Sequence, residues 1–161
     1  MGWRAQRSGA AAEPPCVVSD LIPVDRVARS VSRVTTTMLG KTFRPTAAAP
    51  PARWRTVVLP IPGKRPVTVA LSVDRRSCAA MTAAMLGLDE GGLDPAMMDD
   101  FMRELANMTA GQIKRELALD QALGLPKLLD GDVLFSTRPW THHVLDSDSI
   151  HLVVSLLPAI V

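Results

Sequence analysis

The sequence is poor in aromatic side chains. Its 161 residues include no tyrosine, three tryptophans and three phenylalanines, which together make up 4% of the chain. Proteins that bind single-stranded nucleic acids usually stack the bases on aromatic side chains, so the composition disfavours this class. The core of the protein must be built mainly from aliphatic side chains and from the eight methionines.

Cysteine and long apolar segments are also scarce. Cys16 and Cys78 lie far apart and form no CxxC pair, which favours reduced thiols over a disulfide. Arg4 and Arg7 near the start are not followed by the apolar segment of a signal peptide. No run of apolar residues approaches the roughly 20 that a membrane span needs. We therefore expect a cytoplasmic protein that does not bind membranes.

The charge is unevenly distributed, although the formal net charge is only +2. Residues 1–56 contain nine Lys or Arg and three acidic residues, whereas residues 57–161 contain nine and thirteen. A basic segment can bind nucleic acid, but these basic residues are interleaved with Ala, Pro and Thr. We expect a solvated surface without a nucleic-acid partner. Salt-sensitive binding that is lost when residues 1–56 are removed would indicate otherwise.

The order of the predicted elements favours an α+β fold. Residues 1–16, rich in Pro and small residues, read as a disordered leader, and residues 17–161 as one domain. The predicted elements are a helix from residue 20 to 39, a hairpin over 54–73, a short helix over 74–86, a helix from 95 to about 119, and three closing strands within 126–135, 141–146 and 150–161. Pro60 and Pro62 indicate that the first hairpin strand is bent or lies at an edge. The alternating pattern of the second hairpin strand predicts that it is half-buried. These elements predict an antiparallel sheet packed against two long helices and a short one.

The stretch ELANMTAG, residues 104–111, contains three poor helix formers inside a predicted helix. Asn107 and Thr109 each cost a few tenths of a kcal/mol relative to Ala, and Gly111 costs about 1 kcal/mol. Local inconsistencies of this kind tend to mark functional sites.

A helical wheel at about 100° per residue places Asp100, Glu104, Asn107 and Gly111 on one stripe. The apolar residues of the helix fall in a broad sector that we expect to face the core: Met97, Met98, Phe101, Met102, Leu105, Met108 and Ile113. Ala106, Ala110 and Gly111 border the stripe, so another macromolecule could approach the helix closely there. Close packing within the protein explains Gly111 equally well.

The segments DFMRELANMTAGQIKREL and LGLP resemble the core motif of the CheX-type phosphatases, relatives of the CheC and FliY proteins of bacterial chemotaxis. In that motif an Asp or Ser precedes a Glu, an Asn follows three residues after the Glu, and a Pro lies downstream. The matching residues are Asp100, Glu104, Asn107 and Pro126. The order of elements over 20–161 also agrees with the family. CheC relatives have two such helices and this chain has one, so the resemblance is to the single-site CheX type.

The resemblance implies hydrolysis of the phosphoaspartate of a CheY-like response-regulator receiver domain. The receiver would bring Mg²⁺, and this chain would need no cofactor or metal of its own. The amide of Asn107 both donates and accepts hydrogen bonds, so it would position the attacking water. Glu104 would bind the receiver's lysine, and Asp100, Gly111 and Pro126 would add contacts. The relatives pair through their sheets, which implies a homodimer.

Two other interpretations remain open. The chain could be a CheX-like signalling or scaffold module that binds a receiver, or another partner, without hydrolysing it. A zinc site is the weaker alternative: His142 and His143 are adjacent on a predicted strand and must face opposite sides. His151 is expected to pair with one of them across a hairpin, but no acid or thiol stands at ligand spacing.

Overall fold

The computed structural model describes residues 22–131 and 138–160. The predicted leader and Cys16 lie outside these residues, as does part of the predicted strand within 126–135. The elements are α1 (Val24–Leu39), β1 (Arg44–Pro45), β2 (Arg55–Ile61), β3 (Val67–Val73), α2 (Arg75–Leu86), a 3-10 turn (Glu90–Gly92), α3 (Pro95–Glu116), β4 (Lys127–Asp130), β5 (Thr141–Ser147) and β6 (Ile150–Leu157). The predicted helices and strands are confirmed within this range, whereas β1 and the 3-10 turn were not predicted.

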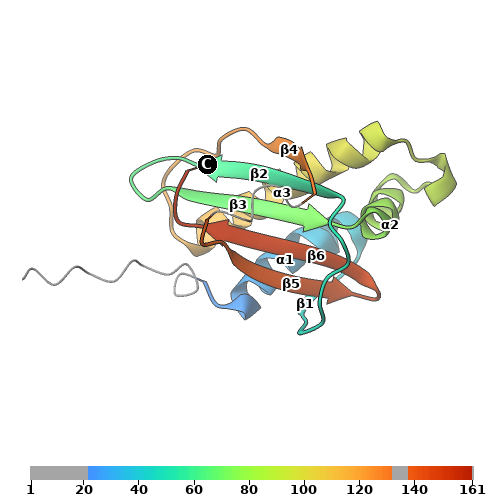
Figure 1. Ribbon diagram of the computed structural model, residues 1–161, viewed down its shortest axis with the longest axis horizontal. Helices are drawn as coiled ribbons and strands as arrows, with labels where there is room; N and C mark the ends of the chain where they lie inside the picture. Colours follow the sequence, from blue (N-terminus) through green and yellow to red (C-terminus); the bar gives the residue numbers. More distant parts are fainter. Residues whose placement is uncertain (1–21, 132–137, 161) are drawn as a thin grey trace, which may run out of the picture.

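The architecture is a helical layer on an antiparallel sheet, as the order of elements predicted. The six strands lie in the order β1-β5-β6-β3-β2-β4, and every pairing is antiparallel. Figure 1 shows α1 and α3 behind the sheet, with α2 beyond one end of the strands. The helices therefore cover one face of the sheet, and α2 meets α3 at its N-terminal end.

α1 is held to the rest of the protein by an apolar stripe that contains Val27, Val31 and Val34, all of which are buried. These residues recur at the three- and four-residue spacing of one helix face. The helix ends at Gly40, whose φ of 66° is in the left-handed region that suits glycine. It begins at Val24, later than predicted, and Val24 itself is exposed.

β2 and β3 form the predicted hairpin, but β2 lies at the edge of the sheet over only part of its length. β4 pairs with β2 from Arg55 to Val58, so the edge prediction is wrong for that part. Pro60 lies beyond the last residue paired with β4, where its missing N–H removes no ladder hydrogen bond. Its carbonyl accepts the N–H of Gly124 at 2.7 Å.

The core lies between the sheet and the helical layer. Val57, Leu71 and Val154 sit side by side in register on the helix-facing side of the sheet, and all three are buried. On the opposite face a smaller cluster contains Val58 and Ala70, with Trp140 and Leu157 packed beside them. Every residue of β3 is therefore buried. The prediction of a half-buried strand is wrong, because this central strand is covered on both faces.

Candidate functional site

α3 is the element that carries the candidate site, and its ends are fixed by local sequence. The Asp94 side chain accepts the N–H of Met97 at 2.9 Å, and Pro95 occupies the first helical position. The helix then continues without a break through Asn107, Thr109 and Gly111. Packing against α1 and β2 therefore maintains a helix that its own composition weakens.

One face of α3 points away from the core, as the wheel predicted. Asp100 and Glu104 are exposed, and Asn107 and Gly111 are half-buried. We call these four residues the α3 stripe. Among the described residues, neither Glu104 nor Asn107 has an ion-pair or side-chain hydrogen-bond partner. A carboxylate and a carboxamide, three residues apart on one helix face, are therefore free to bind another molecule.

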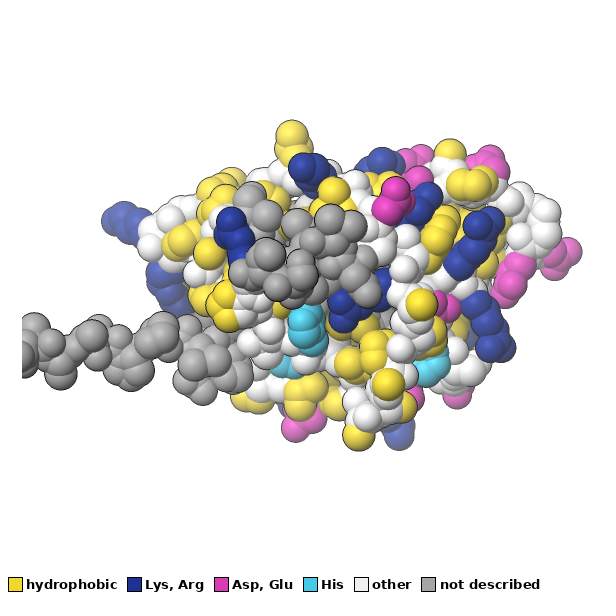
Figure 2. All heavy atoms as spheres, viewed as in Figure 1, with side chains coloured by type: hydrophobic (Ala, Val, Ile, Leu, Met, Phe, Trp, Pro, Cys, Tyr) yellow, Lys and Arg dark blue, Asp and Glu magenta, His cyan; other side chains and the backbone are white. Residues whose placement is uncertain are grey.

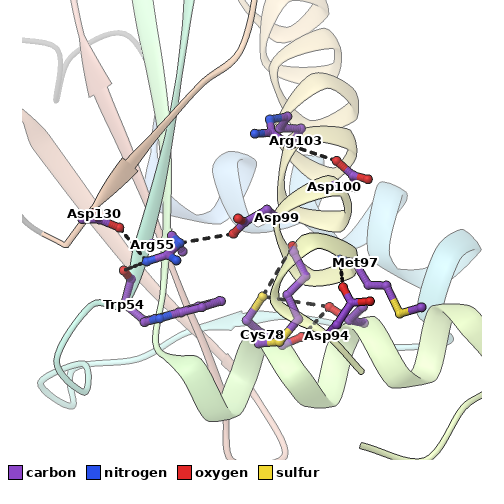
Figure 3. Close-up of polar contacts among 11 residues, drawn as sticks. Trp54, Arg55, Cys78, Asp94, Met97, Asp99, Asp100, Arg103 and Asp130 are labelled. Atoms are coloured by element: carbon purple, nitrogen blue, oxygen red, sulfur yellow. Dashed lines mark hydrogen bonds and ion pairs between the residues drawn. The ribbon is translucent and has the colours of Figure 1, made fainter. Parts of the chain in front are cut away.

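Asp100 differs from Glu104 because it has a partner within the chain. Its carboxylate accepts a hydrogen bond from Arg103 Nη1 at 2.9 Å. Figure 3 shows the neighbouring Asp99 on the other side of α3, directed at Arg55. Arg55 donates to Asp99 at 3.2 Å and to Asp130 at 2.6 Å, which ties α3 to β2 and β4. Asp99 thus anchors the helix, whereas Asp100 stays on the open side and brings a cation, Arg103, to the stripe.

The small residues near the stripe have two different environments. Ala106 and Ala110 are buried members of the core on the helical face. The prediction that they lower the surface for a partner is therefore wrong: their small size serves packing within the protein. Gly111 differs, because a Cβ built there would meet no atom of the described residues within 4 Å, apart from its chain neighbours and the backbone of its own helix. Close packing inside the protein does not explain this glycine.

The apolar sector of α3 is narrower than predicted. Met98, Phe101, Met102, Leu105 and Ile113 are buried, but Met108 is only half-buried and Met97 is 37% exposed. On the helical wheel both methionines fall at the edge of the sector next to Glu104. Met97 instead lines an open cleft of about 330 Å³ between α2 and α3, together with Met85, Leu86, Asp100, Phe101 and Glu104. We call this the α2–α3 cleft. No pattern within a single helix indicates this cleft, since it forms between two helices.

Pro126 lies on a different element from the rest of the predicted site. It is half-buried and directly precedes β4. β4 packs along α3 at the edge of the sheet, so Pro126 shares the α3 side of the molecule. Its role in binding stays a prediction.

A comparison with protein families gives a match over residues 55–144 to the family described as chemotaxis phosphatase CheX. The matched region extends from β2 into β5, covers more than half of the chain and contains all of α3. The chain belongs to the CheX family. The comparison with curated protein sequences gave no match.

Solved structures with the same fold include several CheX proteins. Chemotaxis protein CheX from Vibrio vulnificus superposes with a TM-score of 0.68 at 18% identity, covering 83% of this chain and 93% of that one. CheX from Desulfovibrio desulfuricans gives 0.66 at 18%, with coverage of 84% and 99%. CheX from Borrelia burgdorferi, in a complex with CheY, BeF3 and Mg²⁺, gives 0.64 at 13%, with coverage of 87% and 99%. The predicted α+β fold is confirmed as that of the family.

Other reactive side chains in this CheX-family chain are poorly placed for catalysis. Burial raises the pKa of the Cys78 thiol to about 12, so it is not a thiolate nucleophile at neutral pH. A ring nitrogen of His142 forms a hydrogen bond with the Ser155 hydroxyl at 2.7 Å. The pKa of His143 is lowered, mainly by burial and to a lesser extent by the charge of the neighbouring His142. The two histidines face opposite sides, as predicted, but His151 pairs with Asp146, so its predicted pairing with a histidine is wrong.

Residues 22–131 and 138–160 contain no group of three or more His, Cys, Asp or Glu side chains placed to hold a metal ion. Within the same residues, no helix has the length and apolar character needed to cross a membrane. On the face shown in Figure 2, Lys and Arg side chains are scattered among acidic and apolar ones.

Proposed function

We propose that this CheX-family protein accelerates the hydrolysis of the phosphoaspartate of a CheY-like receiver domain, with the α3 stripe as its catalytic surface. The observation that carries the proposal is the position of Glu104 and Asn107. They lie on one exposed helix face without partners among the described residues, beside a glycine that has open space above it. A helix face of this kind can enter a concave site on another protein.

Asn107 is the residue we assign to the attacking water. Hydrolysis of an acyl phosphate needs a water held in line with the breaking P–O bond. The amide can accept a hydrogen bond from this water and donate another to a phosphoryl oxygen, without changing its protonation state. An aspartate at this position would place a second negative charge against the phosphoryl group.

Glu104 is the residue we assign to docking, since its carboxylate is exposed three residues before Asn107. We propose that it pairs with a lysine of the receiver, and that Asp100 contributes through its field. The complex of the Borrelia CheX with CheY, BeF3 and Mg²⁺ supports a receiver as the partner. In this proposal, charge neutralisation at the phosphoryl oxygens comes from Mg²⁺ carried by the receiver. The two assignments separate binding from catalysis.

The test measures the decay of phosphorylated receivers from a complete cognate panel, with and without the protein. We expect at least one receiver to lose its phosphoryl group faster with the wild type. Asn107→Ala should reduce kcat by about 100-fold, because a misplaced nucleophile loses most of the benefit of positioning. Receiver affinity should remain close to that of the wild type.

Glu104→Gln is the matched control, because it keeps the size of the side chain and removes its charge. We expect it to raise KM more than it lowers kcat. Sedimentation of the wild type tests whether the active unit is the expected homodimer. Turnover by Asn107→Ala equal to that of the wild type would contradict the role of this amide. Receiver binding without acceleration by the wild type would identify a non-catalytic binding module instead.

A further inference from the structure

We propose that the α2–α3 cleft is a second docking site for the receiver, which accepts an apolar side chain next to the lysine that Glu104 binds. This inference rests on the proposed function, because it places the same partner on a surface continuous with the stripe. Asp100 and Glu104 belong to both surfaces: they lie on the α3 stripe and they line the cleft. A protein docked on Glu104 therefore covers the cleft as well.

The walls of the cleft are apolar and uncovered. Leu86 is 43% exposed, and Met85 and Met97 are each 37% exposed, although they converge on one opening. Phe101 closes the inner side and is only 2% exposed. Single exposed apolar residues are ordinary, but a contiguous group beside candidate binding residues is typical of an interaction site. The volume of about 330 Å³ is at the lower end of ligand pockets, and it suits a side chain better than a cofactor.

The charge around the cleft selects the kind of partner. Two carboxylates, Asp100 and Glu104, line the cleft without a Lys or Arg among the described residues of its lining, and Asp89, Glu90 and Asp94 precede them in the chain. α2 also points its C-terminal end at this region and has no basic residue in its last turn, so its dipole adds negative potential. A partner that inserts an apolar side chain into the cleft would bind more tightly if it also carries a cationic side chain beside it. A receiver that presents a lysine to Glu104 has this combination.

The same charges argue against a second copy of this chain as the occupant. In a two-fold symmetric dimer the same surface is present on both sides of the interface, so the carboxylates of Asp100 and Glu104 from both copies would be gathered in it. Like charges placed against each other across an interface are unfavourable. The receiver is therefore the occupant to which we commit.

The test uses the double variant Met85→Ser/Leu86→Ser in the full chain. Both side chains are partly exposed on the last turn of α2, so we expect the melting temperature to stay near that of the wild type. Receiver affinity, measured by titration calorimetry, should weaken about tenfold, and KM for the phosphorylated receiver should rise to match. The value of kcat should stay within about twofold, because neither side chain contacts the proposed reacting groups.

Val24→Ser is the control, since Val24 is 38% exposed, much like Met85, and lies on α1 outside the cleft and the stripe. It should leave receiver affinity unchanged. Unchanged affinity in the double variant, or a lower kcat at unchanged KM, would overturn the inference. So would a loss of self-association without a change in receiver affinity, because the occupant would then be a second copy. If the wild type binds a receiver through the cleft but never accelerates its dephosphorylation, the inference stands and the proposed function fails.

Discussion

Two adjacent residues of α3, Ala110 and Gly111, are both small for opposite reasons. Ala110 is fully buried in the core on the helical face, among other buried apolar residues. Gly111 lies on the α3 stripe, where a Cβ would meet nothing within 4 Å. The residues on the two faces of this helix are therefore small for different reasons: packing in the core on one face and open space on the other. The inner face is explained by the fold, and the outer face is not.

The difference shows how a functional surface can be separated from a packing surface. On the inner face, unfavourable helix propensity is offset by burial against α1 and the sheet. On the outer face, Asn107 and Gly111 weaken the helix; among the described residues the Asn107 side chain makes no hydrogen bond, and a Cβ at Gly111 would have no packing neighbour. Residues that lower helix stability without stabilising contacts inside the protein are typical of functional sites. This supports the proposed binding of a partner to the outer face. Substitutions on the two faces should separate stability from activity.

The largest expected effect is on the inner face. Phe101→Ala should lower the free energy of unfolding by about 3–5 kcal/mol, because it removes a side chain that is 98% buried and leaves a cavity. Urea unfolding measures the loss. Met97→Ala is the control on the same helix, and it should cost less than about 1.5 kcal/mol because that side chain is already partly exposed. Equal losses in the two variants would contradict the division of α3 into two faces.

A smaller effect of opposite sign is expected at Thr109, one of the poor helix formers. Its side chain is fully buried, and its hydroxyl has no hydrogen-bond partner among residues 22–131 and 138–160. Thr109→Val keeps the shape and removes the unsatisfied group, so it should raise the free energy of unfolding by about 1 kcal/mol. The thermal melt should shift upward, and the proposed phosphatase activity should not change. Lower activity at higher stability would show that Thr109 acts on the stripe through the helix.

Much of the fold could be predicted from local sequence. Asp74 and Asp94 stand directly before their helices and cap them, with bonds of 2.9 Å from the N–H groups of Ser77 and Met97. Gly40 and Gly87 end α1 and α2 in the left-handed conformation. These features depend on a few neighbouring residues, and turn or cap chemistry is specific enough to indicate them. The direction of the α3 stripe also follows from the period of one helix.

The errors concern contacts between segments distant in the chain. β4 pairs with only part of β2, so Pro60 could not be assigned to an edge or an interior position from local pattern. The environment of Ala106 depends on how α1 lies against α3. The α2–α3 cleft needs Leu86 and Glu104 to come together, and no periodicity within either helix encodes this. Burial and surface shape are thus properties of the packed layers.

The smallest effect on stability is expected at Gly111, and it tests the comparison most directly. Gly111→Ala should raise the free energy of unfolding by about 0.5–1 kcal/mol, since alanine favours the helix and its Cβ has free space. The same methyl group would stand between the stripe and a docked receiver. Overpacking of a close contact costs about 1–3 kcal/mol, so KM for the phosphorylated receiver should rise at least about fivefold.

Thr109→Val provides the matched control for Gly111→Ala, because both should stabilise the same helix by a similar amount from opposite faces. If rigidity of α3 limited activity, both variants would lower it. If the outer face is a docking surface, only Gly111→Ala should weaken receiver binding. A Gly111→Ala protein that is more stable and binds the receiver as tightly as the wild type would show that no partner approaches this part of α3, and the two faces would then differ only in exposure.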